Sequence, residues 1–209
     1  NIYRGLSSGN YTKIENLWST SNYTDDGLTN GTTYYYVVTA VDTGTNESGY
    51  SNEASAKPGA PQTLLNDGFE STPWDANWDG NGTTTWVQDS SAPHAGIYNA
   101  MSDNKNKCFL TSDDLDASTA YNINVTFWFK GTRLDAGDCL VQIYNGSTYN
   151  TWFDLVNYTT YVGGTWCQFS EVITDPQYFI SNFRIRFDTS AIGGGEDAGI
   201  YAVLITINQ

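Results

Sequence analysis

The stretch from Thr33 to Asp42, TYYYVVTAVD, constrains the fold of this chain more than any other part of its sequence. It is rich in β-branched and aromatic residues, which favour extended strands. Alternate side chains of a strand point to the same face, so Tyr34, Tyr36 and Val38 would lie together. The side chains on this face become smaller along the strand, from aromatic residues to small ones, as they do on the core face of a sandwich strand near its end. The stretch therefore predicts one long strand with a buried face.

Short strands separated by turns make up the rest of residues 1–57. They are expected at 1–5, 10–14, 21–27 and 51–56. Residues 63–209 repeat this arrangement, with strands expected at 86–88, 98–102, 108–110, 121–130, 138–144, 151–155, 166–172, 182–188 and 199–207. No segment carries a convincing apolar period of 3.6 residues, so we expect no long helix. Short strands at turn-marked spacing predict an all-β chain.

The second part contains the clearest alternation. Every second residue of 121–129 is apolar, and the apolar residues of 182–188 alternate with Arg184 and Arg186. The strands of residues 63–209 predict an antiparallel β-sandwich of jelly-roll type. Residues 58–62, PGAPQ, contain two prolines and a glycine, which mark a short, stiff linker between the two parts.

The charge of the chain excludes several kinds of partner. Its formal net charge is -14, with only 9 lysines and arginines. Nucleic acids and anionic membranes are bound through clustered positive charge, so we expect neither as a partner. Charged residues make up 15% of the chain, against about 25% in an ordinary soluble domain. A polar surface built from Asn, Thr, Ser and Gly is typical of extracellular β-proteins, so we expect a secreted or cell-surface protein.

Catalytic and zinc motifs are missing from the sequence. Cys108, Cys139 and Cys167 are expected to be buried or paired, and their spacing fits no zinc site, because His94 is the only histidine. No Gly-x-Ser-x-Gly nucleophile elbow occurs, and no run of about 18 apolar residues would span a membrane. We therefore expect a chain without enzymatic activity.

Residues 1–57 resemble a bacterial or archaeal fibronectin type III domain. The residues that carry the resemblance are Ile2-Tyr3-Arg4, Tyr23-Thr24-Asp25, Gly27 to Tyr34, Val38 to Asp42 and Glu47 to Asn52. Such a domain is a sandwich of seven strands, and residues 1–5 look like its third strand. The resemblance implies that the first two strands are absent.

A sandwich without these strands would leave Tyr34, Tyr36 and Val38 uncovered. Burying one such side chain is worth about 1.5–3 kcal/mol, and exposed sheet edges recruit other strands. We therefore expect this strand-completion face to be covered by an upstream segment, by a proteolytically separated piece or by a strand from a neighbouring copy.

Residues 63–209 resemble the jelly-roll domains of MAM-like modules, bacterial cleaved-adhesin domains and carbohydrate-binding modules. The matching motifs are Asp67-Gly68-Phe69-Glu70, Trp86, His94-Ala95-Gly96, Leu110-Thr111-Ser112, Phe127-Trp128-Phe129, Gly137 to Val141, Trp166 and Phe183 to Phe187. These motifs specify a fold more closely than a ligand.

This second resemblance implies a structural Ca²⁺. Related jelly rolls often hold the ion through the glutamate of the opening motif, here Glu70 beside Asp67, and a carboxylate of the last strand. Residues 201–204, YAVL, stand where relatives carry aspartates, so Glu196 and Asp197 from the preceding loop could substitute. Ca²⁺ takes about six to eight oxygen ligands.

A second calcium hypothesis concerns residues 75–81, DANWDGN. They match the first half of a D-x-[DN]-x-[DN]-G calcium loop, but Trp86 occupies the twelfth position, where such a loop carries glutamate. A polar turn is the alternative interpretation.

Aromatic residues in turn-rich stretches suggest a platform for sugar rings. Trp74, Trp78, Tyr149 and Trp152 stand beside Asn and Asp residues there. Sugar sites combine aromatic rings with amides and carboxylates that bind hydroxyl groups. The remaining tryptophans of the second part, Trp86, Trp128 and Trp166, are expected to be core anchors.

Eight sequons of the type Asn-x-Ser/Thr occur in the chain, and most fall in expected loops. They begin at Asn10, Asn22, Asn30, Asn46, Asn81, Asn124, Asn145 and Asn157. In a secreted archaeal or eukaryotic protein we expect them to carry glycans, whereas in a typical bacterium they would have no meaning. Asn124 falls inside a strand and should point to its outer face.

Two functions fit these expectations. The first is a structural subunit of a surface fibre, in which a neighbouring chain completes the first domain by strand addition. The alternative is a glycan-binding or adhesion module of a larger secreted hydrolase or adhesin, with a polysaccharide as its partner.

Overall fold

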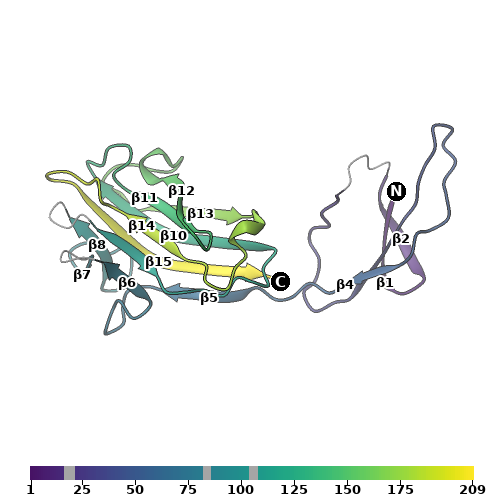
Figure 1. Cartoon of the computed structure of the whole chain (residues 1–209), viewed down its shortest axis with the longest axis horizontal. Helices are drawn as coiled ribbons and strands as arrows, with labels where there is room; N and C mark the ends of the chain where they lie inside the picture. The colour runs from purple at the N-terminus through teal and green to yellow at the C-terminus, as the bar shows by residue number, and fades with distance from the viewer. Residues whose placement is uncertain (17–21, 82–85, 104–107) are drawn as a thin grey trace. The chain divides into compact units, whose positions relative to one another are not determined.

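The computed structural model describes residues 1–16, 22–81, 86–103 and 108–209. The chain divides into two compact units, unit 1 from Asn1 to Ala60 and unit 2 from Pro61 to Gln209 (Figure 1). The described residues form antiparallel strands and two short 3-10 helices, which confirms the predicted all-β fold. No helix within these ranges is long and apolar enough to cross a membrane.

Unit 1 contains one four-stranded antiparallel sheet in the order β2-β1-β3-β4. The strands are β1 (Ile2–Ser7), β2 (Asn10–Glu15), β3 (Tyr34–Val38) and β4 (Ala54–Ala56). The long strand predicted at 33–42 is therefore shorter, and beyond it Val41 forms only an isolated bridge with Glu47. The strand predicted at 21–27 is absent from the described residues 22–27.

The strand-completion face predicted in unit 1 is only partly buried. Tyr34, Tyr36 and Val38 alternate on that face, and Val38 lies opposite Ile2 in the register. Tyr34 is buried, but Val38 is 49% exposed. Val38 is therefore uncovered, as expected for a face without a partner sheet, and unit 1 has no second sheet among its described residues.

The other face of this sheet is covered by its own tyrosines. Val37 points to that side opposite Tyr3 and is buried. The ring of Tyr50 makes edge-to-face contacts there, with centroids 5.1 Å from Tyr3 and 5.4 Å from Tyr11. On the face that carries Val38, Asp25 accepts a hydrogen bond from the hydroxyl of Tyr36, and the N–H of Thr29 donates to the hydroxyl of Tyr34, so that face is open only toward Val38.

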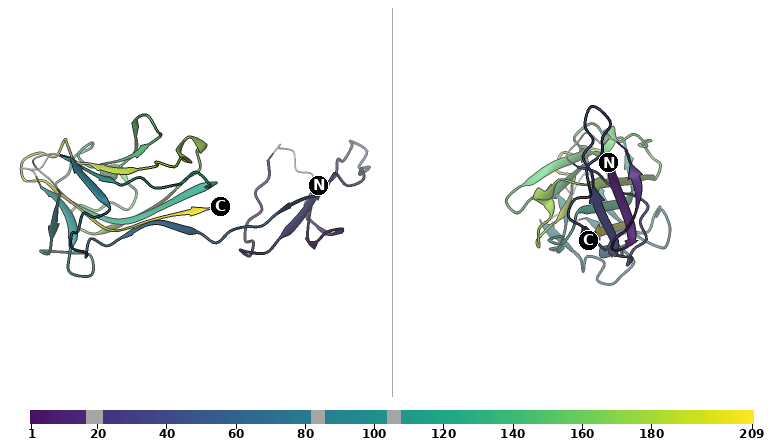
Figure 2. Two further views of the ribbon diagram at one scale, coloured as in Figure 1. Left: turned by 60° about the horizontal axis from the view of Figure 1, so that its bottom comes forward. Right: turned by 90° about the vertical axis from the view of Figure 1, so that its right-hand side faces the viewer.

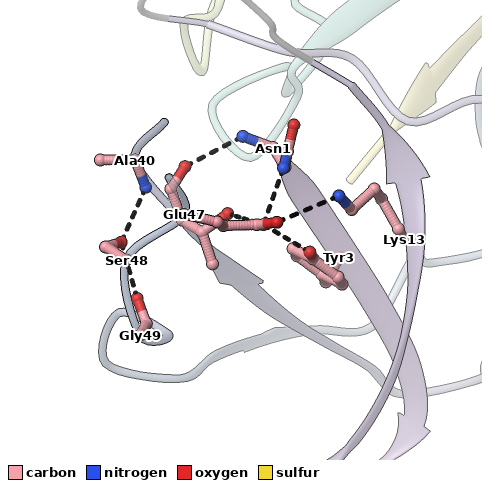
Figure 3. Close-up of polar contacts among 8 residues, drawn as sticks. Asn1, Tyr3, Lys13, Ala40, Glu47, Ser48 and Gly49 are labelled. Atoms are coloured by element: carbon pink, nitrogen blue, oxygen red, sulfur yellow. Dashed lines mark hydrogen bonds and ion pairs between the residues drawn. The ribbon is translucent and has the colours of Figure 1, made fainter. Parts of the chain in front are cut away.

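The side chain of Glu47 contacts the start of the chain, strand β2 and the segment that follows β3 (Figure 3). Its Oε1 accepts a hydrogen bond from Asn1 Nδ2 at 2.7 Å and others from the hydroxyls of Tyr3 and Thr39. Its Oε2 lies 3.3 Å from Nζ of Lys13 on β2. The hydrogen bond from Thr39, followed by that from Tyr3, lowers the pKa of Glu47 to about 2.

Unit 2 is a sandwich of two antiparallel sheets, in agreement with the predicted jelly roll (Figure 1). The first sheet has the order β13-β10-β15-β8-β7 with β5 also paired to β15, and the second has the order β12-β11-β14-β9-β6. The strands are β5 (Gln62–Asp67), β6 (Trp78–Asn81), β7 (Val87–Asp89), β8 (Asn99–Asp103), β9 (Phe109–Ser112), β10 (Asn122–Thr132), β11 (Leu140–Tyr144), β12 (Tyr149–Asp154), β13 (Cys167–Ile173), β14 (Ile185–Asp188) and β15 (Asp197–Asn208). Two 3-10 helices, η1 (Leu155–Asn157) and η2 (Pro176–Tyr178), follow β12 and β13.

Strand β15 organises the first sheet. It pairs with β10 along most of its length, from Asp197 to Asn208. On its other side β8 pairs with residues 197–200 and β5 with residues 203–207. Figures 1 and 2 show β5 and β15 lying side by side. Three segments that are far apart in the sequence therefore meet on one strand.

Alternating apolar residues of β10 form the centre of the core, as predicted. Ile123, Val125, Phe127 and Phe129 are each at most 2% exposed. The ring of Phe127 contacts Phe187 of β14 edge to face, with centroids 4.9 Å apart. The core therefore lies between the two sheets.

The expected core anchors differ in burial. Trp86 is buried, as predicted. Trp128 alternates with the buried Phe127 and Phe129, so its side chain points to the outer face of β10, where it stacks on His94 at a centroid distance of 3.9 Å. Trp166 is also only partly buried and contacts His94 edge to face. The three cysteines are buried, and no disulfide joins them in the described part of the chain.

Candidate binding face

The outer face of the five-stranded sheet carries the most chemically diverse side chains of unit 2. In β11 and β14 the residues that point inward are almost completely buried, namely Val141, Ile143, Ile185 and Phe187. Strand alternation therefore turns Gln142, Arg186 and Asp188 outward, and Gln142 lies opposite Arg186 in the register.

Arg186 lies between two aromatic rings on this face. Its guanidinium carbon is 3.8 Å from the ring centroid of Tyr149 on β12 and 4.2 Å from that of Phe109 on β9. Contacts of this kind combine cation–π attraction with planar stacking. Burial lowers the pKa of Arg186, and the negative charge of Asp188 opposes that shift.

Gln142 connects the arginine to a carboxylate. Its Oε1 accepts hydrogen bonds from Nε of Arg186, at 2.8 Å, and from a terminal guanidinium nitrogen of the same residue. Its Nε2 donates to Oδ2 of Asp188 at 3.0 Å. Asp188 also accepts a hydrogen bond from the backbone N–H of Ser190 at 2.9 Å. These contacts fix the orientation of the amide and of the guanidinium plane.

A second arginine extends the same surface. The rings of Tyr144 and Tyr149 are 5.0 Å apart, and the guanidinium carbon of Arg184 is 5.5 Å from the Tyr144 ring. Nε of Arg184 donates to Asp114, and this hydrogen bond raises the pKa of Arg184. We call this surface the tyrosine–arginine face and define it by Phe109, Gln142, Tyr144, Tyr149, Arg184, Arg186 and Asp188. Flat rings beside fixed donors and acceptors suit a ligand with an apolar surface and hydroxyl edges.

Only one of the four predicted platform residues, Tyr149, lies on this face. Trp78 is 4% exposed, because its ring packs against Phe69 and its Nε1 donates to Asp67 at 2.9 Å. The prediction that Trp78 stacks on a sugar is therefore wrong. Trp74 packs against the edge of the core at Phe69, and Trp152 packs against Phe153 and Phe169.

The arginines of this face were not predicted as site residues, although the sequence contained a signal for them. Arg184 and Arg186 alternate with the buried residues Phe183, Ile185 and Phe187, so alternation predicts that both arginines point away from the core. Their aromatic partners come from β9, β11 and β12, which are distant in the sequence. Periodicity alone does not identify such neighbours.

The three predicted calcium ligands do not meet in one place. Asp67 lies opposite Val203 of β15, and Asp197 is six residues further along that strand, a separation of about 20 Å. Both Asp67 oxygens accept hydrogen bonds, Oδ1 from the backbone of Phe69 and Oδ2 from the indole of Trp78. The predicted combination of ligands is thus wrong.

Glu70 instead anchors a loop. Its Oε1 accepts hydrogen bonds from the backbone N–H groups of Ile97 at 2.9 Å and Tyr98 at 3.1 Å. Gly96 has a φ of +68°, and a Cβ at this position would lie 2.1 Å from Oε1. The His-Ala-Gly motif therefore needs its glycine so that the carboxylate can approach the backbone.

Two other acidic stretches among the described residues bear on calcium binding. Residues 78–81 of the second calcium hypothesis belong to β6, which pairs with β9, so they do not turn back around an ion. Among the described residues, Asp135, Asp138 and Glu196 bring carboxylate oxygens within 4.8 Å of one another. Asp138 and Glu196 already accept backbone hydrogen bonds from Asp135 and Gly193.

Asn124 points to the outer face of β10, as predicted, because its neighbours Ile123 and Val125 are buried. Its Nδ2 donates to Asn122 and Thr206 at 3.3 and 3.4 Å. The other sequons remain predictions of glycosylation.

Comparison with known proteins gives a partial likeness. No family model matches the chain. Over 62 residues, 29% of the chain, it is 48% identical to an amylopullulanase of Thermoanaerobacter thermohydrosulfuricus and 42% identical to one of Thermoanaerobacterium thermosulfurigenes. These matches span only 4% and 3% of the two enzymes.

Solved structures resemble the larger part of the chain. A cleaved adhesin domain of Lys-gingipain from Porphyromonas gingivalis matches 70% of this chain and 99% of its own length, with a TM-score of 0.53 and 15% identity. A xylan-binding domain from Paenibacillus barcinonensis matches 71% of this chain and 96% of its own length, with a TM-score of 0.47 and 14% identity. At such identities, the adhesin domain shows a shared fold.

Proposed function

We propose that this chain is a non-catalytic carbohydrate-binding part of a larger secreted hydrolase. The observation that carries the proposal is Arg186, whose guanidinium group is held between Phe109 and Tyr149 and oriented by Gln142. The short matches to two amylopullulanases support a hydrolase context and make α-glucans the first ligands to test.

The chemistry of the tyrosine–arginine face suits a neutral polysaccharide. Tyrosine rings provide flat apolar surfaces for pyranose rings, while guanidinium, amide and carboxylate groups bind hydroxyl groups. The chain carries a formal net charge of -14. Long-range repulsion would disfavour anionic polysaccharides, so we expect uncharged glycans to bind best.

The fixed geometry of the face favours affinity. The hydrogen bonds of Gln142 to Arg186 and Asp188 hold the polar groups in place before a ligand arrives. Preorganised groups lose little side-chain entropy on binding.

The test is affinity electrophoresis in gels containing pullulan, amylopectin or xylan, followed by titration calorimetry. We expect retardation by at least one polysaccharide, and we expect Tyr149→Ala to weaken binding at least about tenfold, the equivalent of 1.4 kcal/mol. The matched control is Tyr121→Ala, because Tyr121 is 58% exposed and lies outside this face. Absence of retardation, or equal affinity of Tyr149→Ala and the wild type, would overturn the proposal.

A fibre or surface-layer subunit is the second candidate, and one observation favours it. The face of unit 1 that carries Tyr34, Tyr36 and Val38 is open at Val38. A strand from another copy of the chain, or from an upstream segment, would cover it. Electron microscopy of the native material tests this candidate: filaments support it, and isolated particles contradict it. The comparisons favour carbohydrate binding over the fibre.

A further inference from the structure

A pocket lies where the edges of the two sheets of unit 2 face each other. Strand β12 is an edge of the five-stranded sheet, and β13 is an edge of the other sheet. Between them lies a pocket with a volume of about 290 Å³. We call it the edge pocket; its lining consists of Ile143, Thr151, Trp152, Val172, Ile173, Thr174, Asp175 and Tyr178.

Packing fixes both aromatic residues of the edge pocket. The ring of Trp152 contacts Phe153 and Phe169 edge to face, with centroid distances of 5.1 and 5.5 Å. Tyr178 is 8% exposed, and its hydroxyl accepts a hydrogen bond from Nδ2 of Asn150 at 3.2 Å. These rings form an apolar surface of fixed shape.

The rest of the lining separates into an apolar and a polar part. Ile143 and Ile173 belong to the core. Thr151, Thr174 and Asp175 add hydroxyl and carboxylate groups, and Asp175 is held by hydrogen bonds from the backbone and side chain of Gln177. An apolar surface beside oxygen-rich groups is complementary to a sugar ring, which has an apolar face and a hydroxyl edge.

We propose that the edge pocket binds one uncharged pyranose ring, as a second subsite beside the tyrosine–arginine face. The inference rests on the proposed carbohydrate binding of this chain. The volume is near the lower end of the range of about 300–1,000 Å³ found for ligand pockets, which suits a single ring better than a chain of rings. Trp152 is three residues from Tyr149 on β12, a distance of about 10 Å along the strand.

The experiment follows the indole N–H signal of Trp152 by NMR in ¹⁵N-labelled protein during titration with glucose and maltose. The blocking variant is Val172→Arg, because Val172 lines the pocket and is 49% exposed. The matched control is Val87→Arg, since Val87 is 45% exposed on β7, at the opposite end of the same sheet. Retention by polysaccharide gels is measured in parallel for each variant and for Tyr149→Ala.

We expect the Trp152 signal to shift in a saturable way in the wild type, in Val87→Arg and in Tyr149→Ala. In Val172→Arg the apparent affinity should fall at least about tenfold. Gel retention that depends on Tyr149, without any shift of the Trp152 signal, would refute the pocket and leave the proposed function intact. An equal response in Val172→Arg and Val87→Arg would also refute the pocket. A Trp152 response without gel retention would overturn the tyrosine–arginine face alone, and the absence of both would overturn both proposals.

Discussion

Arg186 and Tyr149 are in contact although their strands are not neighbours in the sheet: the guanidinium carbon lies 3.8 Å from the ring centroid, and β11 lies between β14 and β12. The side chain of Arg186 therefore crosses β11 and covers Gln142, which is 9% exposed. The side chain of Arg186 therefore links β14, β11 and β12 through direct contacts on their outer face.

Replacing Arg186 with lysine tests the role of the planar group. Arg186→Lys keeps the positive charge but loses the stacking plane and the paired N–H donors. We expect affinity for the retained polysaccharide to fall at least about tenfold, as measured by calorimetry. Arg4→Lys in unit 1 is the control and should bind like the wild type. Unchanged affinity of Arg186→Lys would mean that charge alone is sufficient.

Replacing Gln142 with leucine tests the polar network. Gln142→Leu removes one partner each from Arg186 and Asp188. We expect the free energy of unfolding to fall by about 1–3 kcal/mol, because partly buried polar groups lose hydrogen bonds. Urea denaturation measures this change, with the exposed Gln168→Leu on β13 as the control. Equal stability of the two variants would show that the network contributes little.

Trp78→Phe separates a role in the core from a role in binding. The phenyl ring retains much of the apolar packing, but the buried Asp67 loses a hydrogen-bond donor. We expect a loss of about 1–3 kcal/mol in unfolding free energy and unchanged affinity for polysaccharide. Tyr149→Ala should give the opposite pattern. A specific loss of binding in a stable Trp78→Phe variant would contradict the buried position of this indole.

Low pH should destabilise unit 1, because Glu47 becomes protonated. The pKa of Glu47 is about 2 in the folded chain, below its ordinary value of 4.5. The stability that this lowered pKa contributes is present above pH 4.5 and is lost as the pH falls toward 2. Hydrogen exchange of the amides of β1, compared between pH 5 and pH 2.5, should accelerate in the wild type more than in Glu47→Gln. The same acceleration in both would exclude Glu47 as the cause.

The sequence predicted the fold of unit 2 well, because alternation in β10 and β14 reports directly which side chains face the core. It predicted the tyrosine–arginine face less well. Trp78 stands among Asp, Asn and Gly residues and resembled an exposed aromatic, yet Asp67 gives its indole a buried hydrogen-bond partner. The local composition around Trp78 does not reveal that hydrogen bond, because its two residues are 11 positions apart in the sequence.

The predicted combination of calcium ligands failed for a related reason. Asp67 and Asp197 were predicted to share one calcium site because of the resemblance to other jelly rolls. The register of β5 on β15 places them far apart. Only strand pairing fixes that register, and periodicity does not specify it. Arg186 illustrates the opposite case, because its exposed side followed from alternation while its aromatic neighbours did not.

The position of β15 sets the order in which unit 2 assembles during synthesis. Residues 197–208 are the last strand of the described chain, yet β5, β8 and β10 all pair with them. Before β15 is made, the edges of those three strands that face it are unpaired, and their contacts with β15 span long sequence separations, which slow folding. The six-stranded sheet therefore closes only after translation of residues 197–208, whereas the four strands of the unit 1 sheet all lie within residues 2–56.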